Sequence, residues 1–421
     1  MLCFQRNAVI GALAALALAA CSPAKEPAAP QRINMAALSS PSGPGSAEPF
    51  VSATGHGELI LSWLEREADS SMTRLRIATM DGAGAWGTPS DVVRAKDLFV
   101  NWADFPSVAV LASGRLLAHW LQKNGSGKYA YDVRLSESAD GGRSWSESVL
   151  PHEPNVPAEH GFVTLLPRPD SSADIVFLSG SVAPDAKRGA PVEAEGHGPP
   201  MRLALAHWRG SRVVGTTEIL DTRTCDCCQT AAALTSNGPV ILYRDRSDAE
   251  MRDISVRRHV NGAWTSPVPL HADGWVIDAC PVNGPAISAQ GEDVVAVWFT
   301  AAQDTARVLL AFSTDAGATF GPPMRVDAGA PNGRVDVELL ADGDAIVTWI
   351  ERTGPESSEV RARLARRDSG LEPPLTVVRV AKGRATGFPR MARRQNDVVL
   401  AWTMTGAPST IQLASLRIAG R

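Results

Sequence analysis

The stretch Ser138-Ala-Asp140-Gly-Gly142-Arg-Ser-Trp145 returns later in the chain as Ser313-Thr-Asp315-Ala-Gly317-Ala-Thr-Phe320. Both copies have the pattern Ser-x-Asp-x-Gly-x-x-aromatic, and residues 80–86 (MDGAGAW) and 261–264 (NGAW) look like degraded copies. In a hairpin turn of this kind the carboxylate accepts backbone N–H bonds, the glycine adopts a positive φ and the aromatic ring packs into the sheet. The pattern therefore indicates recurring β-hairpins.

A larger repeat surrounds these turns, in which a short apolar strand ends in an aromatic residue or a glycine. The clearest copies are residues 58–63, 115–120, 239–243, 293–298, 345–349 and 397–402, with a weaker copy at 174–180. Successive copies lie about 50 to 65 residues apart, the length of a four-stranded propeller blade with its loops. The sequence thus predicts an all-β fold, a β-propeller of seven blades, or of six if the weak copy is an insertion.

The last copy has room for only three strands before the chain ends. A fourth strand near residues 33–37 would pair the N-terminal part of the domain with its C-terminal part. Such pairing closes the ring and removes a free sheet edge. We therefore expect a propeller closed by an N-terminal strand.

Together the turns and the repeat resemble those of the sialidase-like β-propellers, whose repeats are called BNR repeats or Asp-boxes. The resemblance covers most of residues 50–421, and it implies that the Asp-box aspartates Asp140 and Asp315 are structural. It also implies a ligand site at the mouth of the central channel, formed by loops that enter each innermost strand or leave the second strand.

The resemblance is weaker at the active site. Sialidases use three arginines on the sugar carboxylate, an acidic residue as acid/base and a Tyr–Glu pair as nucleophile, with the tyrosine late in the chain. This chain has three tyrosines, none of them after Tyr243, and it lacks an Arg-Ile-Pro motif near the start of the propeller. The catalytic motifs of a sialidase are therefore largely unmatched.

The loops at the expected mouth nevertheless carry many charged residues. The catalytic candidates are Asp104, Glu351 and Tyr243. The candidates for ligand binding are Arg244, Asp245, Arg246, Asn283, Arg334, Asp336 and Arg384. The loop 181–200, with His197, could cover the mouth. Because arginine forks suit carboxylates, these residues favour a protein that binds a polar ligand, a glycan or a partner protein. The alternative is a glycoside hydrolase of the exo-α-sialidase type.

Four cysteines give a further candidate site. Aligning the fourth repeat with the fifth places Cys280 opposite Cys227 or Cys228, so that these residues and Cys225 meet near one channel mouth. In an oxidising compartment such thiols form two disulfides. The alternatives are a metal site for Cu(I) or zinc, with His271 as a possible further ligand, and a free redox-active thiol.

The first residues predict export. Residues 1–20 read as a signal peptide, too short to span a bilayer, and Leu18-Ala19-Ala20-Cys21 resembles a bacterial lipobox with Cys21 as the lipidated residue. Residues 21–48 are rich in Pro, Ala, Ser and Gly and predict a disordered tether before a propeller at 49–421. Ser22, rather than Asp, follows the cysteine, and by resemblance to enterobacterial lipoproteins this favours the outer membrane over the inner one. A formal net charge of −4 gives no electrostatic case for binding nucleic acid.

Overall fold

The structure is a computed structural model that describes residues 32–419, except 55–56, 69–70, 126, 155–157, 181–200 and 396. The predicted signal peptide, Cys21 and the loop with His197 lie outside the described residues. In the described part the chain forms β1 to β29 and a single turn of 3-10 helix, Ala302–Asp304. In that part we find no helix long and apolar enough to cross a membrane.

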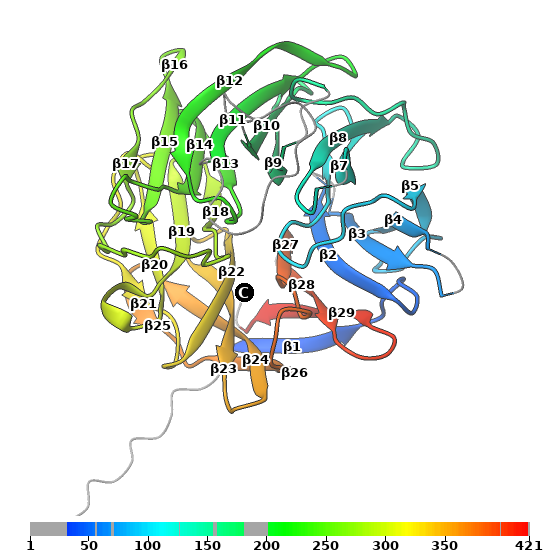
Figure 1. Cartoon of the computed structure of the whole chain (residues 1–421). Coiled ribbons are helices and arrows are strands. Elements are labelled where there is room, and N and C mark those ends of the chain that lie inside the picture. The colour runs from blue at the N-terminus through cyan, green and yellow to red at the C-terminus, as the bar shows by residue number, and fades with distance from the viewer. Residues whose placement is uncertain are drawn as a thin grey trace, which may run out of the picture. The chain divides into compact units, whose positions relative to one another are not determined.

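The strands form seven sheets, which surround a central channel as blades (Figure 1). Blade 1 contains β2 (Ser46–Ala53), β3 (Leu59–Arg66), β4 (Thr73–Met80) and β5 (Ser90–Ala95). Blade 2 contains β6 (Ser107–Val110), β7 (Leu116–Lys123) and β8 (Tyr131–Ser138). Blade 3 contains β9 (His160–Pro167), β10 (Ala173–Ser179), β11 (Met201–Trp208) and β12 (Val213–Thr224). Blade 4 contains β13 (Ala231–Thr235), β14 (Gly238–Arg244), β15 (Ile254–Val260), β16 (Ala263–Trp264) and β17 (Val268–Pro269).

The remaining blades complete the ring. Blade 5 contains β18 (Ala286–Gln290), β19 (Asp293–Thr300), β20 (Arg307–Ser313) and β21 (Met324–Arg325). Blade 6 contains β22 (Pro331–Leu339), β23 (Ala345–Arg352), β24 (Ser357–Arg366), β25 (Gly370–Leu371) and β26 (Leu375–Ala381). Blade 7 contains β27 (Arg390–Arg394), β28 (Asp397–Met404), β29 (Thr410–Ile418) and β1 (Ile33–Leu38). The first strand of each of blades 1 to 6, and β27 of blade 7, is innermost, and these seven strands contact one another around the channel.

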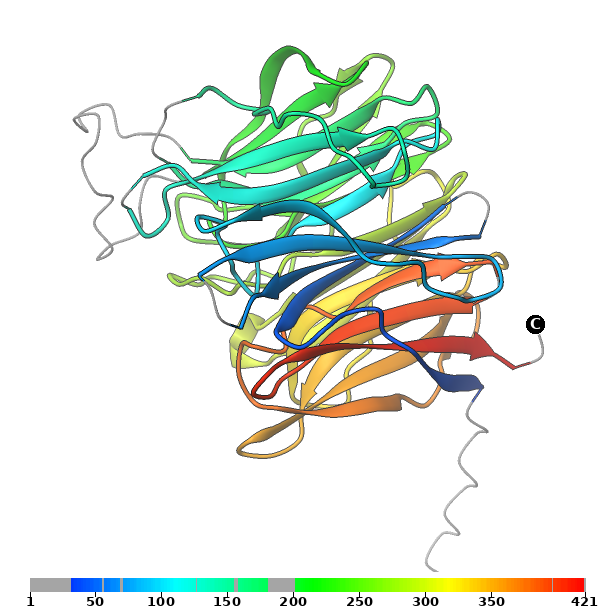
Figure 2. The ribbon, with the colours of Figure 1, turned by 90° about the vertical axis from the view of Figure 1, so that its right-hand side faces the viewer.

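The ring closes as the sequence predicts. β1 pairs antiparallel with β29, from Ile33 opposite Ile418 to Leu38 opposite Leu413, and the two strands lie side by side in Figure 2. The weak repeat at 174–180 is β10, the second strand of a complete blade, so the six-bladed alternative is wrong. The predicted start of the propeller at residue 49 is also too late. The pairing of β1 and the burial of Ile33 order part of the stretch predicted as tether.

The second strands lie in the middle of their blades and are buried on both faces, which explains their continuous apolar sequences. Trp63, Trp298 and Trp349, which end three of the repeats, have 0% exposure. The core consists of layers between neighbouring blades. One such layer joins Leu61 and Trp63 of blade 1 to Val399 and Leu413 of blade 7, so the closing interface is packed like the others.

Both Asp-boxes have the hydrogen bonds expected from the pattern. Asp140 Oδ1 accepts from the backbone N–H groups of Arg143 and Ser144, at 3.0 and 2.9 Å. Asp315 Oδ1 accepts from Thr319 N at 2.9 Å. Each box follows the third strand of its blade, and because the strands alternate in direction it lies on the face opposite the expected mouth.

Candidate functional site

The loops that enter the innermost strands open on one face and surround the channel. A cavity of about 160 Å³ lies in the channel, and its lining includes Phe50, Asp104, Phe105, Gln229, Asp336 and Arg390. Gln229 crosses between loops, because its Nε2 donates to Ala103 O and its Oε1 accepts from Gly284 N at 2.9 Å. Pockets that enclose an organic ligand are usually larger, about 300 Å³ or more. A sugar would therefore bind at the mouth rather than inside the channel.

Aromatic rings line one side of this mouth. Trp102 and Phe388 are stacked with ring centroids 6.0 Å apart, Phe388 lies 5.7 Å from Phe105, and Phe105 lies 6.3 Å from Phe50. The rings come from blade 1, the loop before β6 and the loop before β27. They form a continuous apolar surface between loops that are distant in sequence.

Three arginines lie on these rings. The guanidinium carbons of Arg334 and Arg384 are 4.5 and 5.8 Å from the centroid of the Trp102 ring. That of Arg390 is 5.2 Å from Phe50 and 5.5 Å from Phe105. We call these three arginines and the four rings the arginine–aromatic cluster. A guanidinium over an aromatic face is held by attraction to the ring quadrupole.

Within the described part of the chain, no acidic neighbour neutralises the positive charges of Arg334 and Arg384. Arg334 donates to the carbonyls of Gly383 and Gly387, at 2.8 and 3.3 Å. Burial, together with the charge of Arg384, lowers the pKa of Arg334 to about 10. Among the described residues, Arg390 pairs with Asp336 at 3.5 Å, whereas neither Arg334 nor Arg384 has an ion-pair partner. This geometry leaves room for an external anion.

Other predicted ligand residues hold the mouth loops together instead. Arg244 makes four hydrogen bonds to the carbonyls of Asn283, Arg252 and Phe299, which clamps blade 4 to blade 5. Asn283 Oδ1 accepts from Arg334 N at 2.7 Å.

The remaining candidates, Asp245, Asp336 and Arg246, also make contacts within the protein. Asp245 accepts from Ser255 Oγ at 2.9 Å, and Asp336 Oδ2 accepts from Met391 N at 2.7 Å. Arg246 binds both carboxylate oxygens of Asp226 at 3.0 Å. These side chains position the loops that carry the site.

Two of the catalytic candidates are engaged within their own blades. The carboxylate of Glu351 accepts from the indole N–H of Trp349 at 2.6 Å and from the backbone N–H groups of Ala328 and Ala330. Tyr243 donates to Asp221 Oδ2 at 2.5 Å, and burial raises the pKa of this phenol above its usual value. Neither side chain is poised for catalysis in this arrangement.

The third candidate, Asp104, belongs to a buried trio that the sequence did not predict. Tyr131 Oη lies 3.0 Å from Asp104 Oδ2 and 2.7 Å from Glu159 Oε1. Burial raises the pKa of Asp104 to about 7 and that of Glu159 to about 8. A phenol has one proton to donate, so one carboxyl group must itself be protonated for both hydrogen bonds to form. Tyr131 has 0% exposure and stacks on Phe99.

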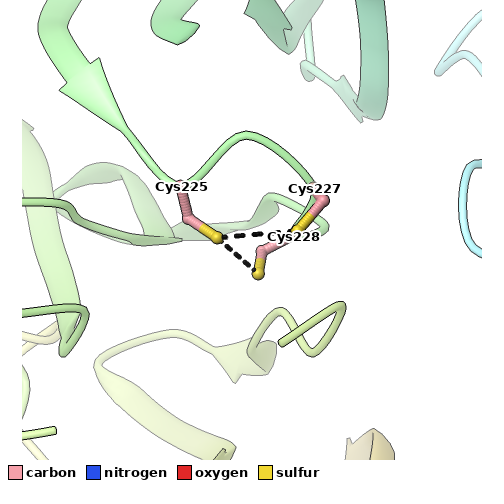
Figure 3. A group of neighbouring side chains, drawn as sticks. All are labelled: Cys225, Cys227 and Cys228. Carbon is pink, nitrogen blue, oxygen red and sulfur yellow. Dashed lines mark hydrogen bonds between the residues drawn. The ribbon is translucent and has the colours of Figure 1, made fainter. Parts of the chain in front are cut away.

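The cysteines of the loop before β13 come together (Figure 3). Cys225 Sγ lies 2.9 Å from Cys228 Sγ and 4.0 Å from Cys227 Sγ. Cys280, from the loop before β18, is one of the neighbours that raise the pKa of Cys227, although it lies outside the group of three close sulfurs. All four cysteines are free thiols, so no disulfide is formed among the described residues. His271 instead contacts Asp273, with Nδ1 2.7 Å from Oδ1.

Beside blades 2 and 3, Asp132, His152 and His160 form another close group. The two imidazole rings are stacked nearly parallel, with centroids 3.8 Å apart and 11° between the planes. A metal ion lies in the plane of each imidazole that binds it, and parallel stacked planes do not meet at one ion. In addition, Val133 N donates to His152 Nε2 at 3.2 Å. We therefore regard this group as structural.

Solved structures that are similar to the chain include several sialidases. A protein of unknown function from Dyadobacter fermentans has a TM-score of 0.53 at 14% identity, covering 92% of this chain and 99% of its own. The phage phi92 endosialidase has a TM-score of 0.51 at 11% identity, covering 93% and 70%. The K499G mutant of NanB sialidase from Streptococcus pneumoniae has a TM-score of 0.44 at 12% identity, covering 88% and 68%. No family model and no curated protein sequence matches the chain.

At these identities the likeness concerns the fold. The arrangement of residues at the mouth must be judged on its own geometry. That geometry brings Arg334 close to Arg384, and it also brings the cysteines together. Asp104 lies beside Tyr131 and Glu159. The other predicted residues make contacts within the protein.

Proposed function

We propose that this protein is a lipid-anchored envelope protein whose propeller binds an acidic glycan at the arginine–aromatic cluster. The observation that carries the proposal is the pair Arg334 and Arg384, which lie over one tryptophan ring and have no acidic partner among the residues that the structure describes. A guanidinium fork binds a carboxylate or sulfate through two parallel hydrogen bonds. The partly exposed ring of Trp102 supplies an apolar face for the carbon skeleton of the ligand.

The position of the cluster supports this function. Arg384 is exposed, while Arg334 is 8% exposed and held in place by two carbonyls. The guanidinium of Arg334 is therefore fixed, whereas that of Arg384 can move toward a ligand. The predicted export and lipid anchor would place this mouth in the cell envelope, where acidic glycans are available.

Hydrolysis is the second candidate function, favoured by the trio of Asp104, Tyr131 and Glu159. A tyrosine beside a glutamate, with an aspartic acid near it, is the set of groups that a sialidase uses. In this protein the phenol of Tyr131 has 0% exposure, so a sugar cannot reach it in the observed arrangement. We therefore expect binding without turnover.

The test is isothermal titration calorimetry of the full-length protein with sialyllactose, an oligogalacturonate, a sulfated oligosaccharide and neutral lactose. We expect at least one acidic sugar to bind and lactose not to bind. Arg384→Ala should weaken binding by about tenfold or more, as expected for a central interface arginine. Arg212→Ala, an exposed arginine at the turn between β11 and β12 on the opposite face, is the matched control.

Equal binding of lactose, or an unchanged affinity in Arg384→Ala, would contradict the proposal. A fluorogenic sialoside distinguishes the second candidate function. Turnover that disappears in Glu159→Gln would establish hydrolysis and show that the trio becomes accessible.

A further inference from the structure

The loop Cys225–Cys228 is held in place through its first two residues. Cys225 N donates to Arg244 O at 3.0 Å, which fixes the start of the loop to the end of β14. Arg246 holds the Asp226 carboxylate and also donates to Glu250 at 2.9 Å. The three sulfurs of the loop are therefore presented by a fixed backbone rather than by a flexible segment.

The sulfur positions suit one metal ion. The three Sγ atoms lie within 4.8 Å of one another, and they point toward a common centre (Figure 3). A metal–thiolate bond is about 2.3 Å long, so three sulfurs around one ion are separated by about 4 Å. The Cys225–Cys227 sulfur separation of 4.0 Å matches that arrangement, whereas Cys225 and Cys228, with their sulfurs at 2.9 Å, would have to move apart to bind the ion.

The surroundings offset part of the negative charge that thiolate ligands would carry. Arg252 has 0% exposure, and its Nη1 lies 3.6 Å from Cys225 Sγ. The Glu250 carboxylate holds the other end of this guanidinium at 2.7 Å. Arg244 is the second buried guanidinium near Cys225. Three thiolates with one monovalent cation have a net charge of −2, and Arg252 and Arg244 offset part of it, since the Glu250 carboxylate also pairs with Arg252.

The exposure of the four cysteines differs from one side of the group to the other. Cys225 and Cys228 are 0% and 2% exposed, whereas Cys227 is partly exposed and Cys280 is exposed. A metal ion would therefore pass Cys227 and Cys280 before it reaches the buried pair.

We propose that Cys225, Cys227 and Cys228 form a binding site for Cu(I) at the channel mouth, independent of the glycan site. Soft thiolates select Cu(I), which accepts three sulfur ligands. A structural zinc site takes four ligands, commonly with a different cysteine spacing. The imidazole that the sequence offered as a further ligand, His271, is bound to Asp273 instead.

The test uses the full-length protein, reduced and kept anaerobic, with Cu(I) supplied as its coloured complex with bathocuproine disulfonate. We expect the protein to remove one equivalent of Cu(I) from the chelator. X-ray absorption should show three sulfur neighbours. Cys225→Ser and Cys228→Ser should each weaken binding more than about a hundredfold, since even loss of an outer-shell partner costs about 10- to 100-fold. Arg252→Met should weaken binding within that smaller range.

Cys280→Ser tests whether the exposed thiol near Cys227 is a fourth ligand, because this thiol lies outside the three-sulfur group. This variant should still bind one equivalent of Cu(I), and a loss as large as that of Cys225→Ser would overturn the three-sulfur site. Circular dichroism of each variant checks that it is folded.

Two other results would also overturn the proposal. One is preferential retention of Zn(II) over Cu(I) in competition. The other is a mass four protons below that of the reduced chain in protein purified without reductant, which would show two disulfides in place of the metal ligands.

Discussion

Tyr131 joins two carboxyl groups, from loops 55 residues apart, at one hydroxyl between blades 2 and 3. Asp104 also accepts from Phe162 N at 2.7 Å, so the trio fixes the start of β9 as well as the loop before β6. Gly161 is needed here, because a Cβ at this position would collide with the Asp104 carboxylate and the Tyr131 ring. The trio therefore has a structural role even if it has no catalytic one.

The trio should make stability depend on pH. The pKa values of Asp104 and Glu159, about 7 and 8, lie above their ordinary values of 3.8 and 4.5. At a pH between the ordinary pKa values and the raised ones, the folded protein binds more protons than the unfolded chain. The free energy of unfolding should therefore fall as the pH rises from about 4 to about 8. Urea unfolding across this range should show the decline. Asp104→Asn and Glu159→Gln should flatten it.

Glu147→Gln, which changes an exposed carboxyl group, is the control and should keep the slope of the parent protein. A parent protein whose stability is constant or rises across this range would contradict the shared proton. The two carboxyl groups interact through one phenol, so the measured slope belongs to the pair rather than to either residue.

For single residues, the sequence predicts the face of the propeller on which a side chain lies better than it predicts the partners of that side chain. Arg244 and Arg384 were both placed at the mouth, but Arg244 binds backbone carbonyls whereas Arg384 is exposed. Asp104 is among the predicted residues, whereas nothing in the sequence points to its partners Tyr131 and Glu159. Partners that meet across blades leave no periodic signal, since each contact joins loops of different repeats.

The Asp-box turns connect neighbouring blades as well as strands of one blade. Gly142 has φ of 87° and lies against Ile77 of blade 1, and Gly317 has φ of 74° and lies against Val240 of blade 4. Trp145 and Phe320 pack into the same layers. The glycine in the pattern therefore provides space for the adjacent blade in addition to a turn.

Two neighbouring glycines in the first box allow the need for space to be measured apart from the need for a positive φ. Gly141 and Gly142 both have positive φ, but only Gly142 lacks space for a Cβ. Gly142→Ala should therefore lower the free energy of unfolding by about 1 to 3 kcal/mol more than Gly141→Ala, the usual cost of overpacking. Chemical denaturation of the two variants measures the difference. Equal losses would mean that backbone strain alone accounts for the glycine.

The closing strand can be tested in the same way. Ile33 of β1 is 3% exposed and packs among residues of blades 6 and 7, whereas Met35 on the same strand is 44% exposed. Ile33→Ala should lower the free energy of unfolding by about 2 kcal/mol or more. Met35→Ala should change it by less than about 0.5 kcal/mol. If both variants were as stable as the parent, β1 would not contribute to closure.

For the whole molecule, the repeat predicted the seven blades because each second strand is buried on both faces and keeps its apolar sequence. The sequence predicts a closing strand near residues 33–37 but also a tether at residues 21–48, because β1 is an outer strand with four exposed residues out of six. Its composition resembles a tether, and its order comes from pairing with β29. Because successive strands of a blade run in opposite directions, the sequence shows which loops lie at the mouth. That the cysteines lie close together could be predicted only by aligning two repeats.

The first residues of the chain predict how the whole protein is held in the cell. We propose that Cys21 is lipidated, because residues 18–21 resemble a lipobox. One acyl chain gives only weak membrane binding, whereas two or more hold a protein stably, at about 0.8 kcal/mol per buried methylene. Cys21→Ser should therefore abolish labelling by a palmitate analogue and leave an uncleaved or mis-cleaved precursor. Cys3→Ser, which changes the other cysteine of the leader, should be labelled and processed like the parent. Labelling of Cys21→Ser at the level of the parent would refute the anchor.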